Sequence, residues 1–142
     1  MKVQIINGPN LNLLGKREPD VYGATSFDTF FQELMKKFPG LTLTYMQSNI
    51  EGELVNQLQQ SGFESNGIIL NAGAYTHTSI ALHDAIAAVP APVIEVHISN
   101  VYAREEFRHK SLITSKCVGL ITGFGLLGYE LAIQYLLSKQ KV

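Results

Sequence analysis

The chain has 142 residues, with 11 Lys and Arg against 12 Asp and Glu, and its formal net charge is −1. This length is typical of one domain that buries roughly two-thirds of the surface of its unfolded chain. The balanced charge, without a run of basic residues, does not favour a nucleic acid or an anionic membrane as partner. One cysteine excludes an internal disulfide, and neither a leader nor a membrane-spanning apolar run is evident. We therefore expect a cytoplasmic protein that acts on a small molecule.

The apolar run over residues 2–6 predicts a first strand, and the loop that follows is punctuated by Gly8, Gly15 and Gly23. In a chain of alternating strands and helices, the loop after an inner strand lies over the carboxyl edge of the sheet, where such folds bind ligands. The leucines of this loop need apolar surface to bury. We therefore interpret residues 11–24 as a partly anchored lid.

Helices and strands are expected to alternate along the rest of the chain. Thr25 or Ser26 can cap the first helix, and Thr78 or Ser79 can cap the third. In chain order, we expect a helix over residues 27–38, a strand over 41–45, a helix over 51–62, a strand over 67–71, a helix over 80–89, a strand over 93–97, a short charged helix over 104–109, a strand over 117–121 and a final helix over 127–139.

Five strands that alternate with helices indicate a parallel sheet with both faces covered. By analogy, an α/β flavodoxin-like fold, a three-layer sandwich with a five-stranded sheet of order 2-1-3-4-5, suits this length and places the first strand inside. We expect residues 1–142 to form this single domain.

Polar side chains interrupt the apolar strands near their carboxyl ends, which should bring them to one edge of the sheet. They are Asn7, Asn10, Asn12, Asn71, Glu95, His97 and Ser99. Glu95 and His97 are two residues apart and share one face of a strand. The pair could be an oriented acid and base, two metal ligands, or a structural ion pair in the core.

Three other features have competing interpretations. The remaining histidines show no metal-ligand spacing, so we expect no metal. His77 and Thr78 precede the helix expected over residues 80–89, where backbone N–H groups favour an anion. Asn71 could instead satisfy a turn, and Arg108 could be a solvated charge or a partner for a carboxylate.

Residues 123–128 spell GxGxxG, the outline of a dinucleotide site. Such a site needs a further strand and an acidic residue about 20 positions on, and the sequence offers neither. We expect these glycines to let the last helix pack closely on the sheet.

Four stretches, taken together and in order, resemble the type II 3-dehydroquinate dehydratases, and the resemblance runs over essentially the whole chain. They are NGPNLN at 7–12 with GKREP at 15–19 and Tyr-Gly at 22–23, NAGAYTHTS at 71–79, EVHISN at 95–100 and REEFRH at 104–109. The resemblance implies a flavodoxin-like hydro-lyase of the shikimate pathway of aromatic amino acid biosynthesis. Its reaction converts 3-dehydroquinate to 3-dehydroshikimate and water by anti elimination through an enolate, with no cofactor.

The resemblance also implies residue roles. Tyr22 matches the general base, acting as tyrosinate, and Arg17 the residue that activates it. Ionising a tyrosine near pH 7 costs about 4 kcal/mol, and an arginine about 4 Å away returns about as much at an effective dielectric near 20. His97 matches the general acid, supported by Glu95, and Asn10 matches the residue that holds a water against the enolate oxygen.

The remaining matched positions bind the substrate or join subunits. The substrate-binding set is Asn71, His77, Ile98 through its backbone, Ser99 and Arg108. Asp84 matches a residue that reaches the site of a neighbouring subunit, in a homododecamer built from trimers. Residues 110–117 and 124–127 depart from the common pattern, and we interpret them as packing or subunit contact.

Three alternative functions each require a sequence feature that this chain does not show. A flavodoxin-like FMN-binding module needs a phosphate-cradling loop after the first strand. A receiver-like switch needs clustered acids at the ends of the first and third strands, where this chain has asparagines. A Schiff-base dehydratase needs a desolvated lysine, and the lysines lie at element ends or in polar stretches.

Overall fold

The computed structural model describes residues 1–16, 18, 20 and 24–140. Its strands are β1 (Lys2–Asn7), β2 (Thr42–Gln47), β3 (Gly67–Asn71), β4 (Val93–His97) and β5 (Gly119–Thr122). Its α-helices are α2 (Phe27–Lys37), α3 (Glu51–Glu64), α4 (Ile80–Ala87) and α5 (Leu127–Lys139). Short 3-10 helices are η1 (Leu11–Leu13), η2 (Gly73–His77), η3 (Val101–Ala103), η4 (Glu106–Arg108) and η5 (Thr114–Lys116).

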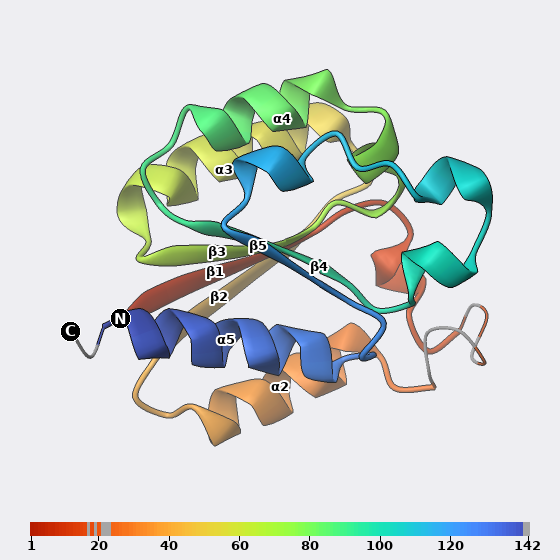
Figure 1. The fold of residues 1–142 in the computed structure, drawn as a ribbon. Helices are drawn as coiled ribbons and strands as arrows, with labels where there is room; N and C mark the ends of the chain where they lie inside the picture. The colour runs from red at the N-terminus through yellow and green to blue at the C-terminus, as the bar shows by residue number, and fades with distance from the viewer. Residues whose placement is uncertain (17, 19, 21–23, 141–142) are drawn as a thin grey trace.

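The five strands form one parallel sheet in the order β2-β1-β3-β4-β5. Helices α3 and α4 cover one face of this sheet, and α2 and α5 cover the other (Figure 1). The predicted α/β flavodoxin-like fold and its strand order are confirmed.

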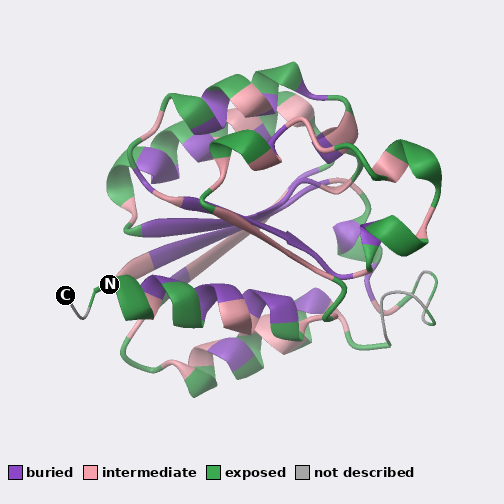
Figure 2. Cartoon of the chain, viewed as in Figure 1, coloured by how far each residue is buried: buried purple, intermediate pink, exposed green. Residues whose placement is uncertain are grey.

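The core lies on both faces of the inner strands, which are buried along most of their length (Figure 2). Within β3, Ile68 and Leu70 pack in the cluster beneath α3 and α4, and Ile69 packs in the cluster beneath α2 and α5. This alternation follows from the two-residue period of a strand. Burying each such side chain contributes about 1.5–3 kcal/mol, so both helical layers are held to the sheet.

Serine side chains cap two of the helices. Ser26 Oγ accepts a hydrogen bond from the backbone N–H of Thr29 at 3.2 Å, and Ser79 Oγ accepts one from Leu82 at 2.9 Å. Of the two residues that could cap each helix, the second one does so. Each cap satisfies a backbone donor that the first helical turn leaves unpaired.

Several predicted elements differ from the structure in their bounds; for example, the helix expected over residues 51–62 continues past Gly62 to Glu64. Residues 104–109 do not form one short helix, because extended backbone at Arg104 and Glu105 separates η3 from η4. The fifth strand begins at Gly119 rather than at Cys117, because η5 ends at Lys116 and Cys117 is its C-cap residue.

Gly128, the last glycine of the GxGxxG stretch, lets the final helix pack closely on the sheet, as predicted. A Cβ atom on Gly128 would lie 3.2 Å from a methyl of Val96 and 3.4 Å from one of Ile121, so α5 approaches β4 and β5 closely. Gly123 has φ of +94°, a conformation that suits glycine where the chain leaves β5.

The first part of the predicted lid is anchored. Leu11 and Leu14 are 8% and 4% exposed and join the core cluster that contains Phe27, while Leu13 stays 39% exposed. Several later residues of the lid lie outside the described part of the chain. Among the helices of the described residues, none is long and apolar enough to cross a membrane.

Candidate active site

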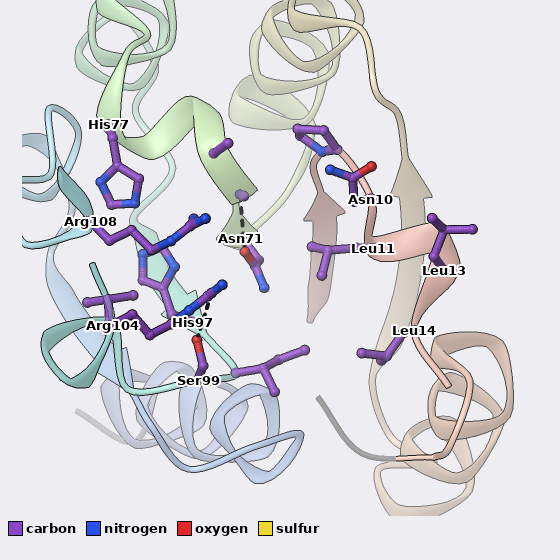
Figure 3. A pocket seen from close by; sticks show the side chains of 15 residues that line it. Asn10, Leu11, Leu13, Leu14, Asn71, His77, His97, Ser99, Arg104 and Arg108 are labelled. Atoms are coloured by element: carbon purple, nitrogen blue, oxygen red, sulfur yellow. Dashed lines mark hydrogen bonds between the residues drawn. The ribbon is translucent and has the colours of Figure 1, made fainter. Parts of the chain in front are cut away.

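A pocket opens at the carboxyl edge of the sheet (Figure 3). The sequence-predicted residues that line it are Asn10, Asn71, His77, His97, Ile98, Ser99 and Arg108. The other lining residues are Pro9, Leu11, Leu13, Leu14, Gly73, Ala74, Val101 and Arg104. The pocket is thus built from the segments that follow β1, β3 and β4, as expected from strands whose carboxyl ends meet.

The two sides of the pocket differ in chemistry (Figure 3). The loop after β1 brings Leu11, Leu13 and Leu14 to one side, where they form an apolar wall. His77, His97 and Arg108 lie on the opposite side (Figure 3). A small anionic ligand with a carbon skeleton would meet cationic or polar groups on one side and hydrocarbon on the other.

Glu95 and His97 form a close pair on β4, with Glu95 Oε2 2.5 Å from His97 Nε2. The two side chains are only 1% and 8% exposed, yet His97 lines the pocket. Nδ1 of His97 has no hydrogen-bond partner among the described residues, so it is available to a ligand. This geometry suits an acid or base oriented by a carboxylate.

A metal-binding role for the pair finds no support in its surroundings. Within residues 1–16, 18, 20 and 24–140, no group of three or more His, Cys, Asp or Glu side chains is placed to hold a metal ion. Cys117 is also no partner for the site: burial raises the pKa of its thiol to about 12, which disfavours the reactive thiolate.

Two hydroxyl groups also contact the Glu95 carboxylate. Thr114 Oγ1 donates to Glu95 Oε1, and Ser111 Oγ lies 3.3 Å from both carboxylate oxygens. Ser111 Oγ also accepts from the backbone N–H groups of Ile113 and Thr114, at 3.2 and 3.1 Å. Its single proton is therefore the one that faces Glu95.

The sequence predicts no site role for Ser111 or Thr114, because residues 110–117 are interpreted from it as packing or subunit contact. They lie 16 and 19 residues after Glu95, and their hydroxyls follow no recognisable spacing. The segment in fact supports the carboxylate of the pair.

His77 is held by one ring nitrogen. Nδ1 lies 2.8 Å from the backbone carbonyl of Lys110, which can only accept, so the proton is on Nδ1 and Nε2 is left for a ligand. The His77 and His97 rings are nearly parallel, with centroids 6.4 Å apart. Both imidazoles can therefore reach one small molecule.

Two backbone N–H groups near His77, where the sequence predicts an anion site, already have partners. The N–H groups of Thr78 and Ser79 both donate to the carbonyl of Tyr75, at 3.3 and 2.9 Å, because η2 intervenes before α4 begins. Asn71 does satisfy a turn, since the Gly73 N–H donates to its Oδ1 at 3.2 Å. Its side chain nevertheless also lines the pocket.

Two arginines line the pocket. Arg108 Nε donates to Glu105 Oε2 at 2.9 Å, and this hydrogen bond lowers the pKa of Glu105 below its ordinary value. Arg104 Nη1 donates to Ser99 Oγ at 3.3 Å. Arg104 had no predicted role, although it stands in the REEFRH stretch, which was the signal that could have found it.

Four of the predicted site residues lie at the edge of the pocket, away from it, or outside the described residues. Asn10 is exposed at the pocket in a left-handed conformation, with φ of 71°, and its backbone N–H donates to Asn49 Oδ1. Asp84 does not line the pocket; its side chain is 73% exposed and lies 2.8 Å from His83 Nδ1. Arg17 and Tyr22 lie outside the described residues.

Comparison with known proteins identifies close relatives. The family model described as "Dehydroquinase class II" matches residues 1–137. The 3-dehydroquinate dehydratase of Exiguobacterium sp. strain AT1b is 57% identical over 139 residues, covering 97% of this chain and 95% of the relative. That of Prochlorococcus marinus strain NATL1A is 50% identical over 143 residues, covering 99% of each.

Solved structures agree with this result. The type II dehydroquinase from Butyrivibrio crossotus superimposes with a TM-score of 0.90 at 45% identity, covering 96% of this chain and 97% of the other. The type II dehydroquinase from Propionibacterium acnes gives a TM-score of 0.91 at 40% identity, with coverage of 95% and 94%. The chain belongs to the class II dehydroquinase family.

Proposed function

We propose that this protein is a 3-dehydroquinate dehydratase, a lyase that removes water from 3-dehydroquinate to give 3-dehydroshikimate in the shikimate pathway. Membership of the class II dehydroquinase family and relatives named 3-dehydroquinate dehydratase support the reaction. The observation that carries the proposal is the buried pair of Glu95 and His97, with His97 open to a pocket lined by polar and cationic groups. We propose that residues 1–142 act as one catalytic domain.

The reaction needs a base and an acid at two places on the substrate. A base takes a proton from the carbon next to the ketone, and the electrons of that C–H bond move onto the ketone oxygen as an enolate. The enolate then re-forms the ketone, the ring double bond forms, and the bond from carbon to the departing hydroxyl breaks. That hydroxyl leaves as water once an acid supplies a proton.

His97 is the residue placed to act as this acid. Its Nε2 is engaged by Glu95, so Nδ1 is the nitrogen that can pass a proton to the departing hydroxyl. The Glu95 carboxylate, surrounded by the hydroxyls of Ser111 and Thr114, stabilises the positive charge that the imidazole carries before the transfer.

The substrate has a carboxylate and several hydroxyl groups, and the pocket offers a donor or acceptor for each kind. Arg108 retains guanidinium N–H groups beyond the one that binds Glu105, and these suit the carboxylate. Nε2 of His77, the amide of Asn71, the hydroxyl of Ser99 and the backbone of Ile98 suit hydroxyl groups. Asn10 is proposed to hold a water against the enolate oxygen.

Tyr22 is proposed as the base and Arg17 as the group that favours its ionised form; both roles rest on the resemblance of the lid to the family pattern. The loop after β1, which carries the lid, faces His97 across the pocket (Figure 3). The anti course of the elimination is proposed from the same resemblance.

Asp84 is proposed to reach the site of a neighbouring subunit in a dodecamer built from trimers. Its side chain is 73% exposed, and it lines a second hollow with Ile80, His83 and Leu112. Ile80 is 68% exposed, a large apolar surface that a second copy of the chain could cover. A cytoplasmic location stays a prediction from the sequence.

The absorbance of the product tests this function, because 3-dehydroshikimate contains a conjugated enone that the substrate lacks. Purified, chelator-treated protein is incubated with 3-dehydroquinate beside a Tyr22→Phe variant. A rise in ultraviolet absorbance with the wild type and not with the variant supports both the reaction and the base. Folded wild-type protein that produces no enone would reject the proposed function.

A further inference from the structure

A chain of buried hydrogen bonds runs beneath the pocket from Asn71 to helix α5. Asn71 Nδ2 donates to the hydroxyl of Tyr129 at 3.1 Å, and this hydroxyl donates to Asn7 Oδ1 at 2.7 Å. The three residues come from β3, α5 and β1, and Asn7 and Asn71 are direct neighbours in the sheet. Asn7 and Tyr129 are completely buried and Asn71 is 4% exposed, so water does not replace these hydrogen bonds.

The direction of the network fixes the orientation of the Asn71 amide. The Gly73 N–H is a donor, so it must face Oδ1, and Nδ2 must then face Tyr129. The Tyr129 hydroxyl accepts from Nδ2 and has its own proton for Asn7. A rotation of the Asn71 amide by half a turn would place a donor against the Gly73 N–H. One amide proton and one lone pair of Asn71 remain for a ligand.

Aromatic packing fixes the position of the Tyr129 hydroxyl. The ring of Tyr129 packs 5.0 Å from Phe27 and 6.0 Å from Phe30 of α2, measured between ring centroids. Gly128, the preceding residue, lets α5 approach the sheet closely. Burial raises the pKa of Tyr129 well above its ordinary value, so the group is a neutral hydroxyl that can donate to Asn7.

Asn7 is the less satisfied end of the network. Its Nδ2 is buried without a well-aligned hydrogen-bond partner among the described residues. Burial raises the pKa of Tyr45, and the side chain of Asn7 lowers it by a smaller amount.

We propose that Tyr129 is a positioning residue for substrate binding, which fixes the orientation of the Asn71 amide and is itself anchored by Asn7. The proposal rests on the proposed function, in which Asn71 binds the substrate. Without the Tyr129 hydroxyl, Nδ2 of Asn71 and Oδ1 of Asn7 lose their shared partner, and the Gly73 N–H is left as the one contact that holds the Asn71 amide among the described residues. Because Asn71 would hold the substrate and the transition state alike, the loss should fall on KM rather than on kcat.

A double-mutant cycle separates this role from a contribution to folding alone. Steady-state kinetics with 3-dehydroquinate are measured for the wild type, Tyr129→Phe, Asn71→Ala and the double variant. We expect Tyr129→Phe to raise KM about 10-fold with kcat within about twofold, and to change kcat/KM by less than about twofold once Asn71 is alanine. Effects that simply add would overturn the proposal.

Tyr135→Phe is the matched control, because it removes the same hydroxyl from the same helix at a position that is 39% exposed. It should leave the kinetics unchanged in both backgrounds. Near-ultraviolet circular dichroism shows whether each variant is folded. If Tyr129→Phe does not fold, Asn7→Ala replaces it in the cycle, since this change removes the anchor and keeps the tyrosine ring.

The outcomes are distinguishable. Inactive wild-type protein rejects the proposed function and this inference with it. Active wild-type protein with an unchanged KM in Tyr129→Phe overturns the inference and leaves the function intact. If neither Tyr129→Phe nor Asn7→Ala folds, the network serves the core alone, and the positioning role is overturned.

Discussion

Thr114 and His97 bind opposite oxygens of one buried carboxylate. The Thr114 hydroxyl donates to Oε1 of Glu95, and Nε2 of His97 lies 2.5 Å from Oε2. Ser111 adds a third contact at 3.3 Å to both oxygens. A carboxylate surrounded in this way by donors is fixed in place and fixes the imidazole in turn.

The first prediction concerns the charge of this carboxylate. Glu95→Gln keeps the size of the side chain but removes the charge, and its amide N–H₂ would meet the hydroxyls that now donate to Glu95. We expect kcat to fall by about 10²-fold or more with KM little changed. We expect the free energy of unfolding to fall by about 1–3 kcal/mol, because buried donors lose their acceptor. Kinetics and urea denaturation measure the two effects, and an unchanged kcat would contradict the role of Glu95.

The second prediction tests the support of the carboxylate. Thr114→Val replaces the hydroxyl with a methyl group of similar size, so Oε1 of Glu95 loses its donor. We expect kcat to fall by about 10-fold without a matching change in KM. Thr114→Ser keeps a hydroxyl and is the matched control, which should retain most of the wild-type kcat. If the valine and serine variants were equally active, the hydroxyl would have no part in catalysis.

The third prediction concerns the proposed base and its activating residue. If Arg17 favours the ionised form of Tyr22, Arg17→Ala should lower kcat by about 10²-fold or more while KM changes only a few-fold. Steady-state kinetics at saturating 3-dehydroquinate measure this difference. An effect confined to KM would assign Arg17 to binding instead.

The fourth prediction follows from the pKa of Cys117, which burial raises to about 12. At pH 8, a thiol with this pKa has about 10³-fold less thiolate than an unfolded one with a pKa near 9, and thiolate is the form that reacts. Iodoacetamide should therefore label the folded protein far more slowly than the protein in urea. Equal rates in both states would contradict the burial of this thiol.

The raised pKa of Cys117 also predicts how the free energy of unfolding changes with pH. Because the thiol holds its proton more tightly in the folded state, its contribution to stability is complete below about pH 9. It is lost as the pH rises from there toward 12. A Cys117→Ala variant should lose less stability over this interval than the wild type, as measured by urea denaturation at each pH.

The fifth prediction concerns assembly. If Asp84 reaches a neighbouring site, Asp84→Asn should keep the sedimentation behaviour of the wild type and weaken substrate binding. Analytical ultracentrifugation and kinetics together test this expectation. Wild-type protein that sediments as a monomer and is fully active would contradict the proposed role of Asp84.

Much of the architecture could be predicted because its causes are local. The apolar run of residues 67–71 and the alternation around Leu43 and Tyr45 are properties of single strands. The parallel order then places the ends of β1, β3 and β4 together, so the sequence pattern is sufficient to place Asn71 and His97 at one edge of the sheet.

The missed residues act over long distances in the chain. Tyr129 lies 58 residues from Asn71 and 122 from Asn7, and as a buried tyrosine on an apolar helix it has the pattern of an ordinary core residue. Ser111 and Thr114 reach Glu95 only because the chain between β4 and β5 turns back over the sheet edge. Such contacts depend on the tertiary structure and cannot be predicted from the spacing of residues in the sequence.

The most direct test of the account is whether His97 acts after the first proton has been removed. Substrate labelled with deuterium next to the ketone is incubated with a His97→Asn variant, and loss of deuterium is followed beside formation of the enone. We predict that exchange of deuterium with solvent continues while enone formation falls by about 10²-fold or more, because the enolate forms but the hydroxyl is not protonated. Exchange and elimination lost in equal measure, or elimination retained, would contradict the assignment of His97 as the general acid.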